Sequence, residues 1–279
     1  WRDDGCLVLR SSGREPVSRS LAPIIPAGDG DWTDYPAGVV KELAAAGVGV
    51  GRGLNLAFDG NLPPGAGLSS SAALEVATAR AVLALAGAEM TPVEVAVLCR
   101  KAENDFVGMP CGILDQGVIA LGRRGGLVSI DCHRMWFGNH PLPTGARLWL
   151  FPSGAGHRLT DSLYAKRHAE CGEALAVLRR DDPGLEALAL AEPAQVEAAS
   201  GDLRPEVHRR ARHVVGETAR TRECLELLEA GDLRGVGRCL FDSHRSSSEL
   251  FGNSTDELDT LVAILGETPG VLGARLTGG

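Results

Sequence analysis

The stretch PPGAGLSSSAAL, at residues 63–74, lies between an apolar segment at 53–58 and a helix-like pattern at 69–86. Its glycines would let the backbone come close to a ligand, and its serines would add N–H groups and hydroxyls at the start of a helix. A helix N-terminus of this composition is a ready site for an anion such as a phosphate. We therefore predict a strand, a phosphate-binding loop and a helix, in this order.

This loop differs from two common nucleotide-binding loops. A Walker A loop would need Gly-Lys followed by Ser or Thr, which is missing here. A dinucleotide fingerprint would need a third Gly or Ala where Ser70 stands. Taken alone, the stretch could also be a Gly/Ser turn followed by an ordinary helix cap.

The rest of the chain predicts a mixed first half and a helical second half. Apolar runs predict strands at 5–10, 53–58, 126–132 and 146–152, and helices at 35–46 and 69–86, the last ending at Gly87. From Asp161 onward the pattern is mostly helical, before a last strand at 271–277. Together these elements indicate an α+β protein of two lobes.

A further helix is predicted from a capping box at residues 91–94 (TPVE), with Pro92 in the first helical position. It should end at Gly108, and a second helix should then carry Cys111 to about Leu121. Both helices belong to the segment AENDFVGMPCGILDQ at 102–116, which is rich in polar residues at the break.

Two acids of that segment, Glu103 and Asp115, stand on opposite sides of the break. A phosphoryl transferase needs an oxygen ligand for Mg²⁺ and a carboxylate near the attacking hydroxyl, and little covalent chemistry remains for the protein. These two side chains could fill those two roles. From spacing alone, however, two surface acids on helix ends are the simpler interpretation.

Both stretches resemble the GHMP kinases. Residues 63–74 resemble the second signature of that family in its galactokinase form, and 102–116 are similar to AExxFVGxxCGIMDQ of galactokinases, with Leu114 in place of Met. The resemblance implies the two-lobed GHMP kinase fold, with an N-terminal lobe like ribosomal protein S5 domain 2 and a ferredoxin-like C-terminal lobe. These lobes would occupy residues 1–143 and 144–279, truncated at the start and at the end.

The resemblance also implies roles for individual residues. ATP would bind along the loop at Gly65, Ala66, Gly67, Leu68, Ser69, Ser70 and Ser71. Mg²⁺ would be bound by Ser71 and Glu103, and Asp115 would act on the sugar hydroxyl as a general base or an orienting group. Because SLYAKR at 162–167 resembles a segment whose tyrosine touches the sugar, Tyr164 is a substrate-binding candidate, although it could simply pack on a helix face.

Two other segments extend the resemblance. WTDYPAGV at 32–39 resembles the family's WxxYxxGV, so that Trp32 would border the adenine or, equally, pack in the core. GARLTGG at 273–279 resembles the opening of the third GHMP signature. Galactokinases begin with GRVNLIGEHTDY, and nothing here matches that motif. We therefore expect the chain to be the middle of the family pattern, and to be inactive or unstable by itself.

The predicted function is that of an ATP-dependent sugar kinase, a phosphotransferase with an alcohol acceptor. It would transfer the γ-phosphoryl group of MgATP to the C1 hydroxyl of galactose, giving galactose 1-phosphate. A kinase for arabinose, N-acetylgalactosamine or a heptose is the alternative, and a non-catalytic galactose sensor is a more distant one, because the serines and both acids are present.

Composition excludes several other classes. The 279 residues carry a net charge of −8, which opposes binding to nucleic acid. The basic run HRRARH at 208–213 is expected to be a solvated helix face. Seven scattered cysteines without a Cys-x-x-Cys pair indicate reduced thiols in a cytoplasmic protein. Since no apolar run reaches about 18 residues, we expect no membrane span, and no obligatory protein partner is evident.

Overall fold

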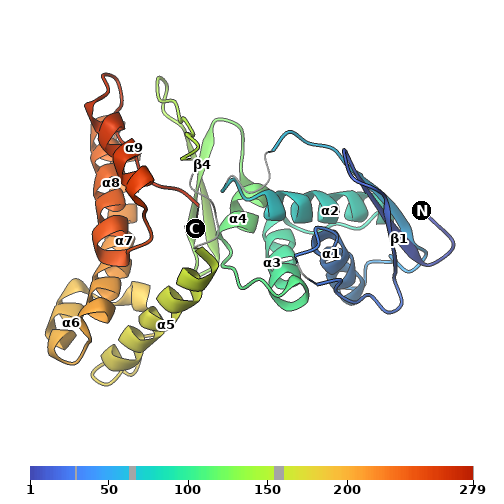
Figure 1. The fold of residues 1–279 in the computed structure, drawn as a ribbon, viewed down its shortest axis with the longest axis horizontal. Coiled ribbons are helices and arrows are strands. Elements are labelled where there is room, and N and C mark those ends of the chain that lie inside the picture. The colour runs from blue at the N-terminus through green and yellow to red at the C-terminus, as the bar shows by residue number, and fades with distance from the viewer. Residues whose placement is uncertain (29, 63–66, 154–159, 279) are drawn as a thin grey trace. The chain divides into compact units, whose positions relative to one another are not determined.

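The computed structural model describes residues 1–28, 30–62, 67–153 and 160–278, with the backbone alone at 160–164. The chain divides into two compact units, Trp1–Leu142 and Pro143–Gly279. Figure 1 shows strands and helices in the first unit and mainly helices in the second. The assignment of the two family domains to 1–143 and 144–279 stays a prediction.

The first unit contains a three-stranded sheet of β1 (Cys6–Ser11), β2 (Val17–Ser20) and β3 (Leu54–Phe58). β1 lies in the middle, antiparallel to β2 and parallel to β3. A parallel neighbour requires a crossover connection, and this one contains helix α1 (Asp34–Ala45). The strands predicted at 5–10 and 53–58 are confirmed, whereas β2 is not among the predicted strands.

Further helices and a hairpin complete this unit: α2 (Ser70–Ala86), α3 (Pro92–Ala102), the π-helical turn η1 (Glu103–Val107), α4 (Leu114–Leu121), β4 (Gly126–Asp131) and β5 (Trp136–Pro141). Gly87 ends α2, and Gly108 ends the run of α3 and η1, both in the left-handed conformation. Thr91 and Glu94 form the predicted capping box. These signals are therefore confirmed.

The hydrophobic core of this unit joins the sheet to the helices. Leu7 and Leu9 of β1 and Leu54 of β3 are fully buried, and they belong to one cluster with Val40 of α1 and Val82 of α2. Alternate residues of β1 are buried, as a strand with one face on a core requires. This core supports α2, whose first residues follow the predicted phosphate loop.

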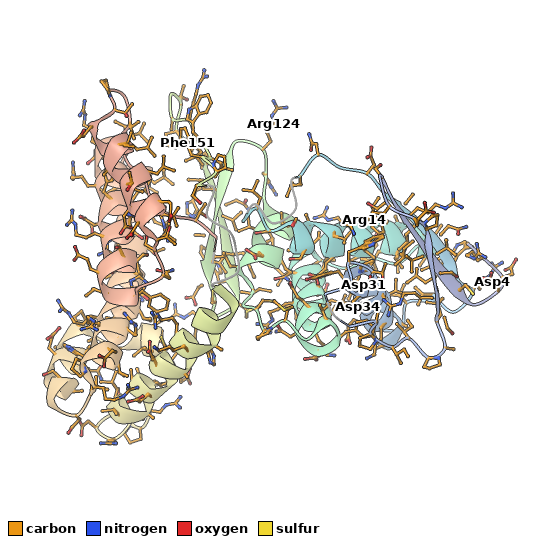
Figure 2. All side chains as sticks on the ribbon, viewed as in Figure 1. Asp4, Arg14, Asp31, Asp34, Arg124 and Phe151 are labelled. Atoms are coloured by element: carbon orange, nitrogen blue, oxygen red, sulfur yellow. The ribbon has the colours of Figure 1, made fainter. Side chains whose placement is uncertain are left out.

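The start of α1 is fixed by a buried ion pair. Asp34 is 2% exposed, and its carboxylate accepts a hydrogen bond from Arg19 of β2 at 2.6 Å. The same carboxylate accepts the N–H groups of Ala27 and Gly28 at 2.8 and 2.9 Å. Figure 2 labels Asp34 beside Asp31, at the beginning of the helix. These bonds connect β2 and the preceding loop to α1.

The second predicted helix of the acid segment begins later than expected, at Leu114 rather than near Cys111. The side chain of Asn104 accounts for this difference. Its Oδ1 accepts the N–H of Cys111 at 2.7 Å, and its Nδ2 donates to the carbonyl of Cys111 at 3.2 Å. Because both backbone groups of Cys111 are used in this way, the segment stays non-helical there.

The second unit is helical over most of its described length. It contains α5 (Thr160–Leu178), α6 (Pro193–Ala198), α7 (Pro205–Glu229), α8 (Leu233–Ser246) and α9 (Asp256–Glu267), with short turns η3 (Leu188–Leu190), η4 (Ala199–Gly201) and η5 (Ser247–Phe251). None of the helices that the structure describes in either unit is long and apolar enough to pass through a bilayer.

The strands predicted at 146–152 and 271–277 are wrong. In the described part of the chain, neither segment pairs with a strand. The apolar side chains of Leu148 to Phe151 are between 52% and 73% exposed. At the other segment, the N–H of Leu276 donates to Nδ1 of His244 at 3.3 Å. An apolar run becomes a strand only where another strand accepts its hydrogen bonds.

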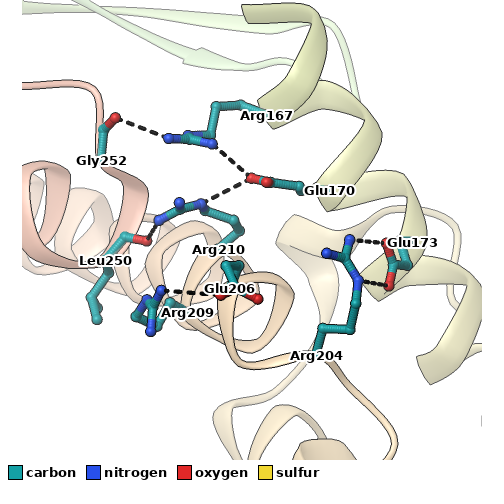
Figure 3. A network of polar contacts seen from close by, with 9 residues as sticks. All are labelled: Arg167, Glu170, Glu173, Arg204, Glu206, Arg209, Arg210, Leu250 and Gly252. Carbon is teal, nitrogen blue, oxygen red and sulfur yellow. Dashed lines mark hydrogen bonds and ion pairs between the residues drawn. The ribbon is translucent and has the colours of Figure 1, made fainter. Parts of the chain in front are cut away.

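The basic run at 208–213 is only partly a solvated face, because Arg210 and His213 are buried. Arg210 of α7 and Arg167 of α5 both bond to one oxygen of Glu170, at 3.0 and 2.9 Å (Figure 3). The two arginines also donate to the carbonyls of Leu250 and Gly252. This buried network holds α5, α7 and the end of η5 together.

We expect Glu170→Gln to destabilise the second unit by about 3–5 kcal/mol, because it leaves two buried arginines without their carboxylate. Glu173→Gln is the matched control on the same helix. Glu173 bonds to Arg204 at 2.6 Å (Figure 3), but the two side chains are 41% and 59% exposed, so solvent screens this pair and its loss should cost clearly less stability than the loss of Glu170. Urea unfolding measures both values, and similar losses in the two variants would contradict the account.

Candidate active site

The described part of the predicted phosphate loop leads directly into α2. Ser69 has φ 53° and ψ 42°, a left-handed conformation that is uncommon for a residue with a Cβ atom. As far as the structure describes this loop, the side chain of Ser69 caps none of the first N–H groups of α2. These groups, at the positive end of the helix, can therefore bind an anion.

The structure describes three of the five remaining predicted loop residues besides Ser69 and Ser71. Gly67, Leu68 and Ser70 are half-buried beside Ser69. Gly65 and Ala66 lie outside the described residues.

Ser71, in the first turn of α2, meets Glu103, the first residue of η1. The Ser71 hydroxyl lies close enough to the Glu103 carboxylate, which is 7% exposed, to lower the pKa of that carboxyl group. Burial is the larger influence and raises the pKa of Glu103, while the nearby side chains of Cys111, Ser71 and Gln116 lower it. The structure thus brings together the two side chains that the sequence predicts as metal ligands.

Asp115 lies in the first turn of α4 and is half-buried. Its negative charge is near enough to raise the pKa values of Glu103 and of Glu75, although burial is the larger cause for both. The two predicted acids therefore lie in one electrostatic neighbourhood, despite the break at Gly108. Glu103 is buried among hydrogen-bond donors, whereas Asp115 keeps access to solvent.

The other two candidates belong to other parts of the chain. Tyr164 belongs to α5 in the second unit, and its side chain is outside the described residues. Trp32 packs edge-on against Phe58, with ring centroids 6.0 Å apart, and the Arg14 guanidinium lies 5.7 Å from the Trp32 ring centroid. Trp32 also borders the hydrophobic core, which supports its packing role.

Two polar residues of the cluster, Glu75 and Gln116, are not predicted from the sequence. Both are completely buried, and Nε2 of Gln116 donates to Glu75 Oε2 at 3.1 Å and to Glu103 Oε2 at 2.5 Å. Cys111 Sγ donates to the same oxygen of Glu103 at 3.4 Å. A single acid within the apolar run AALEVA at 72–77 is the signal that points to Glu75.

The buried Glu75 makes stability depend on pH. Burial, followed by the charge of Glu103, raises the pKa of Glu75 from 4.5 to about 9. Between those values the folded protein holds a proton that the unfolded chain releases, so stability falls as pH rises, by up to about 1.4 kcal/mol per pH unit.

We expect Glu75→Gln, which keeps the shape without the titrating proton, to lose less stability than the unchanged protein between about pH 6 and pH 9. Glu94→Gln is the control. Hydrogen bonds from Thr91 lower the pKa of Glu94, so its contribution changes only at acidic pH. Thermal unfolding across this range measures the slopes, and an unaltered slope in Glu75→Gln would contradict the assignment.

Comparisons with known proteins place the chain in a family. The model of the GHMP kinases N terminal domain matches residues 34–123, and that of GHMP kinases C terminal matches 224–279. A galactokinase of Chloroflexus aggregans is 40% identical over 279 residues, covering 100% of this chain and 71% of that protein. A galactokinase of Chloroflexus aurantiacus is 39% identical over 248 residues, covering 89% and 63%.

Solved structures agree with these matches. The crystal structure of Lactococcus lactis galactokinase complexed with galactose superposes with a TM-score of 0.91 and 29% identity, over 99% of this chain and 72% of that one. Mevalonate kinase of Methanococcus jannaschii, at a TM-score of 0.58 and 17% identity over 99% and 74%, shares the fold alone. The predicted GHMP kinase fold is confirmed, and the chain belongs to the galactokinase family of the GHMP kinases, a family of ATP-dependent sugar kinases.

Proposed function

We propose that the protein carrying this chain transfers the γ-phosphoryl group of ATP to the C1 hydroxyl of galactose. The observation that carries the proposal is the closeness of the Ser71 hydroxyl to the buried Glu103 carboxylate, with the charge of Asp115 near enough to act on both the pKa of Glu103 and that of Glu75. The galactokinase of Lactococcus lactis, which this chain resembles closely, has galactose bound in its crystal structure. That resemblance favours galactose as the acceptor.

The oxygen atoms of Ser71 and Glu103 fit Mg²⁺, which prefers hard oxygen ligands. Across the described ranges, no group of three or more His, Cys, Asp or Glu side chains could hold a metal. Phosphate oxygens and water would therefore complete the coordination, as is usual for Mg²⁺ bound with a nucleotide. When bound, the ion would offset the negative charge of the transferred group.

The phosphates themselves would lie on the loop and on the N-terminus of α2. We assign this contact to the backbone and hydroxyl groups from Gly67 to Ser71, and to Gly65 and Ala66 by family resemblance. The positive end of α2 supports the assignment, since its first N–H groups have no side-chain cap from Ser69 in the described loop. Holding the phosphates in place is a large part of catalysis in phosphoryl transfer.

In the proposed reaction, the oxygen of the C1 hydroxyl attacks the γ-phosphorus, and the bond from that phosphorus to the bridging oxygen of ADP breaks. The hydroxyl proton either passes to the Asp115 carboxylate or leaves later, with Asp115 orienting the hydroxyl. Tyr164 is proposed to contact the sugar. A cytoplasmic location, consistent with seven cysteines that the structure shows unpaired, stays a prediction.

The choice of sugar can be measured with the complete protein. In a coupled assay for ADP, galactose should give a kcat/KM at least about tenfold above those for arabinose, N-acetylgalactosamine and a heptose, because sites that bond to sugar hydroxyls reject misplaced ones. A higher value for one of the other sugars would overturn the galactose assignment and keep the kinase.

The role of Asp115 is tested by Asp115→Asn. We expect turnover to fall about 10²–10⁴-fold, while the Kd for ATP stays within about twofold. Asp105→Asn is the matched control in the same segment, because Asp105 is 60% exposed and pairs with Lys101 at 3.2 Å. If turnover in Asp115→Asn equals that of the control, the catalytic assignment is rejected.

A further inference from the structure

Behind Glu103 lies a buried polar pair that the proposed reaction does not use. Glu75 of α2 and Gln116 of α4 are both 0% exposed. One nitrogen of Gln116 donates hydrogen bonds to both Glu75 and Glu103, at 3.1 and 2.5 Å. The amide of Gln116 is therefore the link between two carboxyl groups on two different helices.

Stability alone does not account for this pair. In the described part of the chain, Oε1 of Glu75 and Oε1 of Gln116 are buried without a hydrogen-bond partner. Each such atom costs about 1–3 kcal/mol. An apolar pair of similar volume would avoid this cost and is often neutral or stabilising in such places. Apart from the bond between its two members, the pair contacts Glu103 and Cys111, and Cys111 itself donates to Glu103. These contacts point to a role in orienting the Glu103 carboxylate.

The helix that carries Gln116 is firmly placed. Gly117 packs so closely on the hairpin of β4 and β5 that a Cβ atom there would lie 2.8 Å from Phe137. On its other side, the Asn104 bonds to Cys111 fix the segment that leads into α4. Gln116 also follows Asp115 directly, so one helical turn carries both the amide that holds Glu103 and the proposed catalytic carboxylate.

We propose that Gln116 is a positioning residue, which fixes the orientation of the Glu103 carboxylate toward Ser71 and a bound metal, with Glu75 anchoring the amide of Gln116. Two donors then act on Oε2 of Glu103, the amide of Gln116 and the thiol of Cys111. This inference rests on the proposed function, because it takes Glu103 as a metal ligand.

The test is Gln116→Met in the complete protein, a change that keeps the side-chain volume and removes the donors. Mn²⁺ is the probe, measured by electron paramagnetic resonance of the free ion in the presence of a saturating non-hydrolysable ATP analogue. We expect the Kd for Mn²⁺ to rise about tenfold or more, as for other residues that orient metal ligands. The Kd for the analogue without metal should stay within about twofold.

Thr78→Val is the matched structural control. Thr78 is fully buried on the helix of Glu75, and its hydroxyl donates to the carbonyl of Leu74 at 2.7 Å. This control variant should lower the melting temperature and leave the Kd for Mn²⁺ unchanged.

If Gln116→Met fails to fold, Glu75→Met tests the positioning role instead. This variant places an apolar side chain in an apolar helix, frees the amide of Gln116, and should raise the Kd for Mn²⁺ several-fold.

Glu103→Gln tests the metal assignment separately from the positioning role of Gln116. It should abolish tight Mn²⁺ binding if Glu103 is a ligand. Wild-type Mn²⁺ affinity in folded Gln116→Met or Glu75→Met, with binding lost in Glu103→Gln, would overturn the positioning role and leave the proposed function standing. Wild-type affinity in Glu103→Gln would overturn the metal assignment, and the positioning role with it.

Discussion

The hydrogen bonds that surround the buried carboxylate of Glu103 are the interaction on which the rest of the candidate site depends. A carboxylate removed from water is costly unless donors replace the water. Here Cys111, before α4, and Gln116, within α4, donate to the carboxylate, and the Ser71 hydroxyl at the start of α2 lies close to it. Satisfying one charge therefore requires three elements to meet at one point.

This requirement explains why the break at Gly108 matters for the candidate site. The chain leaves η1 through a left-handed glycine, and the Asn104 side chain then holds the Cys111 backbone away from helical geometry. As a result α4 starts at Leu114, with Asp115 in its first turn. The two acids of one sequence motif thereby acquire different surroundings: Glu103 is enclosed by donors, while Asp115 remains half-buried. This difference supports the different roles proposed for the two carboxylates.

Local signals in the sequence predict much of this arrangement. The serines at the start of α2, the capping box at Thr91 and the glycines at 87 and 108 act within a few residues, so the sequence alone reveals them. The link from Glu75 through Gln116 to Glu103 is different, because it joins residues up to 41 positions apart. The apolar segment at 146–152 shows the same limit: its pattern indicates what could be buried and says nothing about which strand would pair with it. The burial of Arg210 likewise depends on Glu170 of another helix.

The central claim is that Ser71 and Glu103 hold the metal of the nucleotide while Asp115 faces the sugar. A crystal structure of the complete protein with Mg²⁺, a non-hydrolysable ATP analogue and galactose tests it most directly. The account predicts the Ser71 hydroxyl and a Glu103 oxygen at about 2.1 Å from Mg²⁺. It also predicts the Asp115 carboxylate within about 2.6–3.2 Å of the C1 hydroxyl. Mg²⁺ bound to other side chains, or Asp115 turned away from that hydroxyl, would contradict it.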